Sequence, residues 1–289
     1  MGRRNCGVFG FFLFFVAVML FTITLTDVSN RIKTSFMGAP DAFINSIERE
    51  EKDYEARTIQ AYYRSQHDYR RRTMKIAEQI GATDIVMRVL IPEVTCPHLV
   101  RIGFPADGGK WVCNPFAVPK GCIVYSLGSH NDPSFERDFQ EVTRKRCKIF
   151  TFDKDEPREE TKEEFRRIGV TFDQALIAVE TSQSTGRFSL PDLMAKHGHS
   201  EMHILKMDIE GSEESVLPAF LETQTPCIIL LEIHSDTTVA RQLRLISEKG
   251  YLIYNHEINA AVPTNAEYNF IRKSCLERHG ARYIDRFLS

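Results

Sequence analysis

Carboxylate and imidazole side chains follow two apolar runs in the second half of the sequence. Asp208 and Glu210 come directly after the run His203–Met207, and His234 ends the segment Leu231–His234. A carboxylate or a neutral imidazole placed in this way can take a proton from a hydroxyl group. We therefore predict Asp208 as a general base, with Glu210 either supporting it or binding the acceptor, the molecule that carries the hydroxyl group. His234 is an alternative base, and its ordinary pKa is better suited to proton transfer near neutral pH.

A second set of polar residues follows two earlier apolar runs. Gly128 comes directly after Cys122–Leu127, and Asp153 comes directly after Lys148–Phe152. Glycine at this position would let the backbone approach a ligand closely, and an acidic residue at a strand end can accept both ribose hydroxyls of a nucleoside. The loop lacks the G-x-G-x-x-G pattern of dinucleotide-binding proteins. The predicted cofactor-binding residues are Gly128, Ser129, Asp132, Asp153 and Asp208.

A bound metal ion is another way to activate an acceptor. Asp208 and Glu232 could hold a divalent cation, which would lower the pKa of an acceptor hydroxyl. Paired carboxylates are also common in proteins without any metal, so we predict no metal site here.

Bringing these residues together requires a parallel sheet. Short apolar runs, each bounded by polar or turn residues, are typical of parallel strands that are buried on both faces. Segments with a helical pattern lie between the runs, and this alternation predicts βαβ units in a doubly wound α/β sheet. The expected strands are Cys122–Leu127, Lys148–Phe152, Ala175–Val179, His203–Met207 and Cys227–Leu231, and the expected helices are Phe135–Arg146, Glu159–Ile168, Leu190–His197 and Glu213–Glu222.

The C-terminal part of the chain has a different pattern. Tyr251–Glu257 and Tyr268–Lys273 are strand-like and are separated only by a loop. This spacing predicts an antiparallel hairpin added at the edge of the parallel sheet. Five βα units followed by such a hairpin are the layout of class I methyltransferases, although helix and strand alternation alone also fits many nucleotide-binding enzymes.

Several motifs resemble one enzyme family. KMDIEGSE (Lys206–Glu213) closely resembles the signature of the FkbM-like methyltransferases, and SLPDL (Ser189–Leu193) is similar to theirs. The segments Asp107–Cys113 and Val124–Glu136 look like the animal, membrane-anchored branch of methyltransferase-like proteins. The resemblance covers residues 95–275. It implies a seven-stranded, Rossmann-like class I fold, S-adenosyl-L-methionine as methyl donor, and O-methylation of a hydroxyl or carboxyl acceptor by in-line transfer.

The cofactor loop departs from the pattern that is usual for class I enzymes. Gly128 is followed by Ser129 and His130, where an E/D-x-G-x-G pattern would place a second glycine. This departure keeps open a third interpretation, a methyltransferase-like binding module without catalytic activity.

A type II membrane glycosyltransferase is the main alternative enzyme. Asp153 and Asp155 form a D-x-D motif after an apolar run, and this motif can bind a metal–nucleotide-sugar complex. An N-terminal anchor and a stem would suit that class as well. The motif KMDIEGSE has no role in this alternative.

The N-terminus predicts a membrane anchor. Residues 6–25 carry no charge and are rich in Phe, Leu and Val, and about 20 such residues span a bilayer core as a helix. Arg3 and Arg4 precede the segment and favour a cytoplasmic N-terminus. We therefore expect a single-pass type II protein that faces the lumen of the endoplasmic reticulum or Golgi. A cleaved signal peptide, which would give a secreted protein, is the alternative.

The rest of the chain divides into a stem and a catalytic domain. The predicted boundaries are a tail at 1–5, the anchor at 6–25, a charged helical stem at 26–80 and a methyltransferase domain at 81–289. Tyr62, Tyr69 and Ile76 recur at heptad spacing in the stem, which suggests weak self-association.

Charge and cysteine content limit the partners. The net charge is -2, and no basic patch with interleaved aromatic residues occurs, so we expect no nucleic-acid partner. The expected acceptor is a small molecule, a glycan or a lipid. Six cysteines follow the predicted anchor, an even number that permits disulfides without fixing their pairing. Cys122 and Cys147 have equal offsets on adjacent strands, and we expect them to lie side by side as free thiols.

Overall fold

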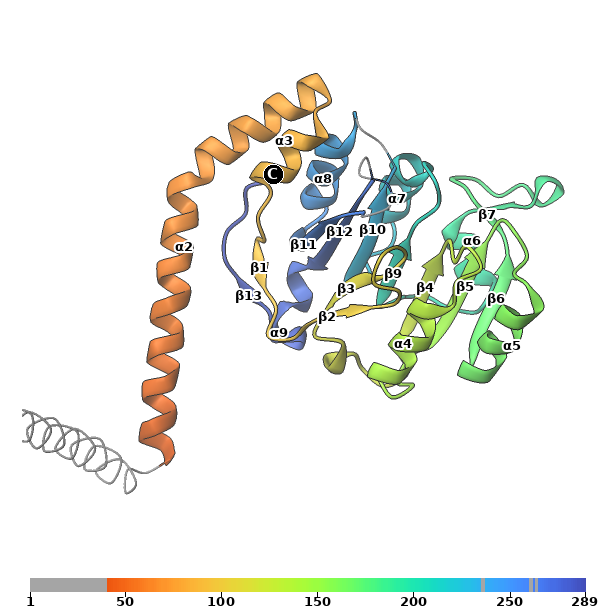
Figure 1. Cartoon of the computed structure of the whole chain (residues 1–289), viewed down its shortest axis with the longest axis horizontal. Helices are drawn as coiled ribbons and strands as arrows, with labels where there is room; N and C mark the ends of the chain where they lie inside the picture. Colours follow the sequence, from red (N-terminus) through yellow and green to blue (C-terminus); the bar gives the residue numbers. More distant parts are fainter. Residues whose placement is uncertain (1–40, 235–236, 260–261, 263–264) are drawn as a thin grey trace, which may run out of the picture. The chain divides into compact units, whose positions relative to one another are not determined.

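Seven strands form the central sheet, in the order β11-β12-β10-β9-β4-β5-β6 (Figure 1). The computed structural model describes residues 41–234, 237–259, 262 and 265–289. Within this sheet β4, β5, β6, β9 and β10 run parallel, and β12 pairs antiparallel with β10 and β11. The mostly parallel sheet with a closing hairpin is therefore confirmed. The strands are β4 (Ile123–Leu127), β5 (Lys148–Asp153), β6 (Val170–Gln174), β9 (Ile204–Met207), β10 (Ile228–Ile233), β11 (Tyr251–Ile258) and β12 (Ala266–Arg272).

The third strand lies earlier in the chain than the sequence suggested. The predicted strand Ala175–Val179 is wrong, because the sheet instead uses β6, and Leu176–Ile177 forms the short strand β7. β7 pairs with β8 (Arg187–Phe188) in a separate ladder. β6 is an edge strand, and its sequence alternates apolar and polar residues instead of running apolar throughout.

Helices cover both faces of the sheet, which gives three layers (Figure 1). Two hydrophobic clusters, one on each face, hold these layers together. The helix α8 was not predicted, although Val239, Leu243 and Ile246 form a buried stripe at helical spacing. One face carries α4 (Ser134–Val142) and α5 (Glu159–Ile168), and the other carries α3 (Thr83–Val89), α6 (Leu190–Lys196), α7 (Glu213–Leu221) and α8 (Val239–Glu248).

Short elements outside the repeating βα units complete the domain. The hairpin of β2 (Leu99–Ile102) and β3 (Lys110–Cys113) packs on the sheet, where β3 contacts β10 and β12. This contact places a hairpin that precedes the sheet strands in the sequence against the strands that carry the predicted site. The other elements are β1 (Val94–Thr95), β13 (Arg282–Tyr283), α9 (Leu276–His279) and three 3-10 turns, η1 (Pro115–Ala117), η2 (Gln183–Thr185) and η3 (Lys273–Cys275).

All six cysteines beyond the predicted anchor form disulfides. The prediction of free thiols at Cys122 and Cys147 is wrong. The two residues do lie side by side, and their Cα atoms are only 4.4 Å apart, within the range that a disulfide spans. Both precede their strands, and the two segments are joined there by backbone hydrogen bonds from the Lys148 amide to the Cys122 carbonyl oxygen and from the Gly121 amide to the Arg146 carbonyl oxygen, at 2.8 and 2.7 Å. The pairs are Cys96–Cys113, Cys122–Cys147 and Cys227–Cys275.

A long helix, α2 (Asp41–Ile80), covers most of the predicted stem. The chain divides into two compact units after Thr58, so the last turns of α2 belong to the unit that contains the sheet. In that unit Tyr62, Tyr69 and Ile76 are exposed. No helix in the described part of the chain is long and apolar enough to cross a membrane. The predicted anchor at 6–25 lies outside the described residues.

Candidate active site

A pocket of about 650 Å³ opens at the carboxyl ends of the parallel strands. This is the edge where open α/β sheets bind their ligands, and the volume lies within the usual range for small-molecule sites. The residues predicted from the sequence come together here as expected. Gly128, Ser129, Asp132, Asp153, Asp208, Glu210 and His234 all line the pocket.

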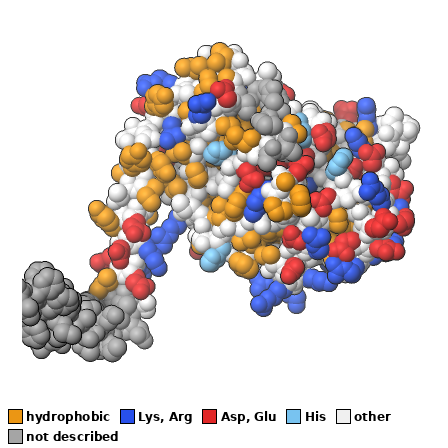
Figure 2. Space-filling view, in the orientation of Figure 1, with side chains coloured by type: hydrophobic (Ala, Val, Ile, Leu, Met, Phe, Trp, Pro, Cys, Tyr) orange, Lys and Arg blue, Asp and Glu red, His pale blue; other side chains and the backbone are white. Residues whose placement is uncertain are grey.

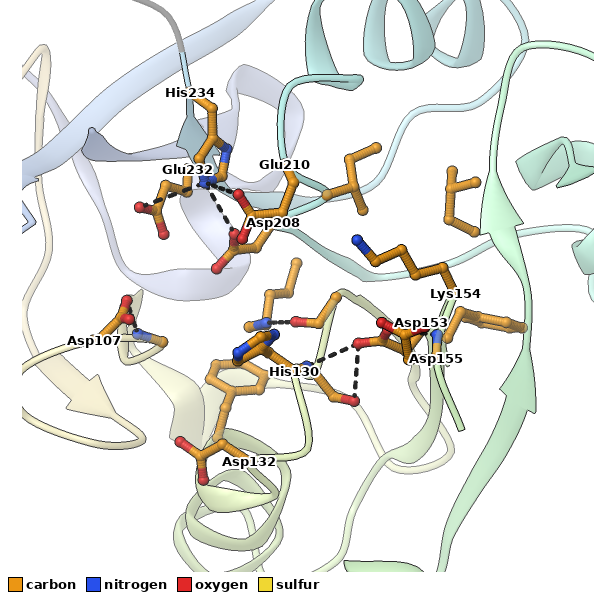
Figure 3. Close-up of a pocket in the computed structure, with 18 of the residues that line it drawn as sticks. Asp107, His130, Asp132, Asp153, Lys154, Asp155, Asp208, Glu210, Glu232 and His234 are labelled. Atoms are coloured by element: carbon orange, nitrogen blue, oxygen red, sulfur yellow. Dashed lines mark hydrogen bonds and ion pairs between the residues drawn. The ribbon is translucent and has the colours of Figure 1, made fainter. Parts of the chain in front are cut away.

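The pocket has two chemically different ends (Figure 3). At one end Asp208, Glu210 and Glu232 gather around His234. At the other end Asp153 lies beside the loop that follows β4. We call these the acceptor end and the donor end, after the roles that the sequence predicts for their residues.

Gly128 joins the two ends of the pocket. Its φ of +77° is in the left-handed region, and a Cβ at this position would collide with the carbonyl oxygen of Asp208. The close approach predicted for Gly128 is therefore to the neighbouring backbone. Lys206 supports the same contact, because its ammonium donates to the Gly128 carbonyl oxygen over 2.9 Å.

Asp153 organises the loop at the donor end. Its Oδ2 accepts from the His130 amide at 2.8 Å and from the Ser129 hydroxyl at 3.5 Å, and its Oδ1 accepts from the Asp155 amide at 3.0 Å. A carboxylate offers about four acceptor positions, so Asp153 retains capacity for a ligand hydroxyl.

Asp132 has a structural role in addition to lining the pocket. Its two carboxylate oxygens accept from the amide and the hydroxyl of Ser134, at 2.9 and 2.8 Å. These contacts fix the first residue of α4.

The donor end fits S-adenosyl-L-methionine. Asp153 could take ribose hydroxyls, and Ala175, Leu176 and Ile177 provide an apolar wall for an adenine ring. The carboxylates of the pocket suit the positive sulfonium and ammonium groups of the donor.

Asp208 is held by a buried lysine at the acceptor end. The Lys110 ammonium, which is fully buried, lies 3.2 Å from Asp208 Oδ2 and 3.3 Å from Glu232 Oε2 and also contacts Glu267. Burial alone would raise the pKa of Asp208, but the charges of Lys110 and Lys206 lower it to about 2. A carboxylate with so low a pKa is a weak proton acceptor.

The buried charges also shift the pKa values of the other members of this group. Burial raises the pKa of Glu267 to about 8, even though Lys110 opposes the shift. Burial alone would lower the pKa of Lys110, but Glu267, Asp208 and Glu232 hold it above its ordinary value.

His234 is oriented by a buried glutamate. Glu213 Oε1 lies 3.0 Å from His234 Nδ1, and Nε2 of the ring faces Asp208 at 3.6 Å and Glu210 at 3.5 Å. Burial alone would lower the pKa of His234, but the bond to Glu213 and the surrounding carboxylates raise it to about 9. The imidazole is therefore protonated at neutral pH.

Glu213 also holds the loop that carries Asp208 and Glu210. Its carboxylate accepts from the amides of Ile209 and Gly211, at 2.9 and 2.8 Å. Glu210 has a φ of +58°, which is uncommon for a residue with a side chain, and its side chain is 67% exposed. The loop therefore directs Glu210 into the open part of the pocket.

Sequence reasoning missed Glu213, Lys110 and Glu267 in this site. Glu213 belongs to the quoted motif, and its position just after a strand-end loop was a usable signal. Lys110 had only an indirect signal, because the buried carboxylates require a buried cation.

Among the residues that the structure describes, two groups of side chains have the spacing that a metal ion needs. One consists of Asp208, Glu210 and His234, and the other of Asp208, Glu232 and Glu267. The second group already surrounds the Lys110 ammonium.

The chain is similar to known methyltransferases. Residues 43–272 match a family model described as a methyltransferase domain. The fibrillarin pre-rRNA processing protein of Methanococcus jannaschii is 10% identical over 56% of this chain and 70% of that chain, with a TM-score of 0.38. The precorrin-6y C5,15-methyltransferase of Geobacter metallireducens is 10% identical over 55% of this chain and 83% of that chain, with a TM-score of 0.36. No curated protein matches the sequence.

The family match covers more than half of the chain and includes the sheet and the pocket. The strand order and the closing hairpin agree with it. The chain therefore belongs to the methyltransferase-domain family and has the class I fold of the S-adenosyl-L-methionine-dependent enzymes.

Proposed function

We propose that this protein is an FkbM-like O-methyltransferase that transfers a methyl group to a hydroxyl acceptor. The observation that carries the proposal is a single pocket with Asp153 at the donor end and the Asp208–His234 group at the acceptor end. Bound S-adenosyl-L-methionine would supply an electrophilic methyl carbon on its sulfonium.

A hydroxyl acceptor fits this pocket better than a carboxyl acceptor. The lining is predominantly acidic, and a carboxylate would meet like charges there. Its cationic side chains are Lys154, Lys206 and the protonated His234, and its acidic ones are Asp107, Asp132, Asp153, Asp155, Asp208, Glu210 and Glu232.

His234 is the proposed general base, in place of Asp208. The buried Glu213 fixes the ring so that Nε2 faces the acceptor end, an arrangement in which a carboxylate orients a catalytic imidazole. The neutral form of His234 would take the acceptor proton on Nε2. Asp208, Glu210 and Glu232 would stabilise the imidazolium that results, and Asp208 would also orient the acceptor hydroxyl.

The compartment proposed from the sequence is the lumen of the secretory pathway. Three disulfides involve all six cysteines beyond the predicted anchor, and disulfides persist in oxidising compartments. We therefore retain the type II topology, with residues 6–25 as the anchor and a glycan, lipid or small-molecule acceptor.

A nucleic-acid acceptor receives no support from the surface charge. Basic side chains are mixed with acidic ones over the region of α4 and α5 on the face that Figure 2 shows. Nucleic-acid-binding surfaces typically gather Lys and Arg side chains on one face, without acidic residues between them.

The first test is ligand binding by calorimetry on the purified full-length chain. S-adenosyl-L-methionine should bind, and a UDP-sugar should not. Binding of the UDP-sugar alone would favour the glycosyltransferase that the D-x-D motif suggested, and would contradict the proposal.

The second test is transfer of a labelled methyl group from the donor to a fractionated lysate. Label should enter an alkali-stable fraction, because methyl ethers resist the base that cleaves methyl esters. His234→Gln and Asp208→Ala should each lower the transfer by at least about 100-fold. Donor binding without any transfer would favour the inactive binding module instead.

A further inference from the structure

Two buried carboxylates and one partly buried carboxylate surround one side-chain ammonium beneath the acceptor end. Asp208 follows β9, Glu232 lies on β10 and Glu267 lies on β12, so neighbouring strands supply them. Lys110 reaches them from β3, which packs across these strands. We call this group the Lys110 cage.

The cage places two carboxyl groups in direct opposition. Glu232 and Glu267 are cross-strand partners in the antiparallel pair of β10 and β12. Two ionised carboxylates at such positions would destabilise a sheet, and burial together with the charge of Glu232 raises the pKa of Glu267 to about 8, so that Glu267 holds a proton at neutral pH. The side chain of Lys110 is 0% exposed, and its ammonium contacts both.

The geometry of the cage is that of a cation site. Oxygen atoms of Asp208, Glu232 and Glu267 lie close enough together to coordinate one ion. Carboxylate oxygens from several strands are the ligands that hard divalent cations prefer. Here a covalently attached ammonium lies among them.

Lys110 does not line the pocket, whereas Asp208 and Glu232 do. Lys110 is therefore linked by contact to an acceptor only through these two carboxylates. Asn259 completes the arrangement, since its amide donates to Glu232 Oε1 over 2.9 Å and leaves Oε2 to Lys110.

We propose that Lys110 is a positioning residue whose ammonium takes the place of a bound metal cation and fixes Asp208 and Glu232 at the acceptor end of the pocket. The proposal rests on the proposed function, because the acceptor end has a purpose only in methyl transfer. It predicts that removal of the ammonium leaves a site that an external cation can fill.

The primary experiment needs neither methyl donor nor acceptor. Mn²⁺ alone is titrated into the full-length chain and followed by electron paramagnetic resonance, in the wild type and in Lys110→Ala. The variant should bind one Mn²⁺ at least about tenfold more tightly than the wild type, and Mn²⁺ should raise the Tm of the variant alone. Equal binding by both proteins, or binding by neither, overturns the proposal.

A matched control removes a cation elsewhere in the same unit. Arg244 lies on α8 and pairs with Glu78 and Glu248, away from the pocket. Arg244→Ala should gain no Mn²⁺ site. If it gains the same site as Lys110→Ala, the Mn²⁺ signal does not report on the cage and the proposal fails.

A second variant covers the case in which Lys110→Ala does not fold. Lys110→Ala/Glu267→Gln removes one cation and one carboxylate together, so it limits the unbalanced buried charge. The folded double variant should still bind Mn²⁺ through Asp208 and Glu232. Its failure to bind the ion overturns the proposal.

Methyl transfer provides the readout that separates positioning from general stability. Lys110→Ala should lose about 100-fold in kcat while the KM for the donor stays unchanged, because the reacting groups lose their alignment. Ethylammonium or Mn²⁺ should restore part of the rate, and sodium should not. Full activity without an added cation overturns the proposal. A wild type without methyl transfer, combined with the expected Mn²⁺ result, refutes the proposed function alone.

Discussion

At the scale of single residues, Asp153 contributes to the site in two ways. It accepts hydrogen bonds from its own loop, and it offers remaining acceptor capacity to a ligand. Asp153→Ala should therefore weaken S-adenosyl-L-methionine binding by at least about tenfold, as measured by calorimetry, because a lost charge-assisted bond costs about 1.5–3 kcal/mol. Asp155→Ala is the control and should have a smaller effect. Unchanged affinity in Asp153→Ala would mean that the ribose ligand is assigned wrongly.

His234 should determine the pH dependence of the reaction. The pKa of about 9 in the free protein means that the neutral, proton-accepting form is a minority at neutral pH. The kcat/KM for methyl transfer should rise about tenfold per pH unit up to about pH 9 and then level. His234→Gln should lower the rate by about 10²–10⁴-fold and remove this rise. A profile that is already flat between pH 6 and 9 would contradict the assignment of His234 as base.

At the scale of elements, one glutamate holds the C-terminal segment. Glu93, which precedes β1, is 1% exposed and accepts from the amides of Ile253, Phe287 and Leu288, at 3.2, 2.8 and 3.1 Å. Glu93→Ala should speed hydrogen exchange at Phe287 and Leu288 and destabilise the fold by about 1–3 kcal/mol for each donor left unsatisfied. Unchanged exchange at these amides would show that other contacts hold the segment.

The same glutamate predicts a pH dependence of stability. Burial raises the pKa of Glu93 to about 7, above its ordinary value, so the folded state binds the proton more tightly than the unfolded state. The contribution is therefore fully present below the ordinary pKa and is lost as pH rises toward 7. Denaturant titrations of Glu93→Gln should show a weaker decline between pH 4.5 and 7 than the wild type. Parallel declines in the two proteins would assign the effect to other groups.

The sequence predicts the elements whose pattern is local. Glu159–Ile168 was predicted with the bounds that α5 has, because Gly169 ends the helix in the left-handed conformation. The edge strand β6 was missed because one-sided burial gives it an alternating pattern.

The site was partly predictable because some of its residues also follow from a local pattern. Carboxylates that end parallel strands meet at one edge of a sheet, so Asp153 and Asp208 could be assigned to one pocket. Lys110 could not, since it lies 98 residues from Asp208 and 157 from Glu267 and reaches them on a hairpin outside the βα pattern. Nothing local in the sequence encodes that contact.

At the scale of the whole molecule, the disulfides give a test of compartment. The six paired cysteines leave only Cys6, which lies outside the described residues, as a further thiol. Thiol titration of unfolded, unreduced protein from its native source should find no more than one thiol per chain. Cys122→Ala/Cys147→Ala should lower the free energy of unfolding by about 2–4 kcal/mol. A count of several thiols would contradict a lumenal location.

The contact between Gly128 and the Asp208 carbonyl bears on how such an enzyme can evolve. The loop that begins at Gly128 and the loop that begins at Asp208 touch through their backbones. A substitution that moves one of these loops therefore displaces the other. We expect new acceptor preferences to arise through residues that line the pocket away from this contact, such as Phe104. Substitutions among related proteins should therefore accumulate at the other pocket-lining residues, while Gly128 and the backbone that it contacts stay unchanged.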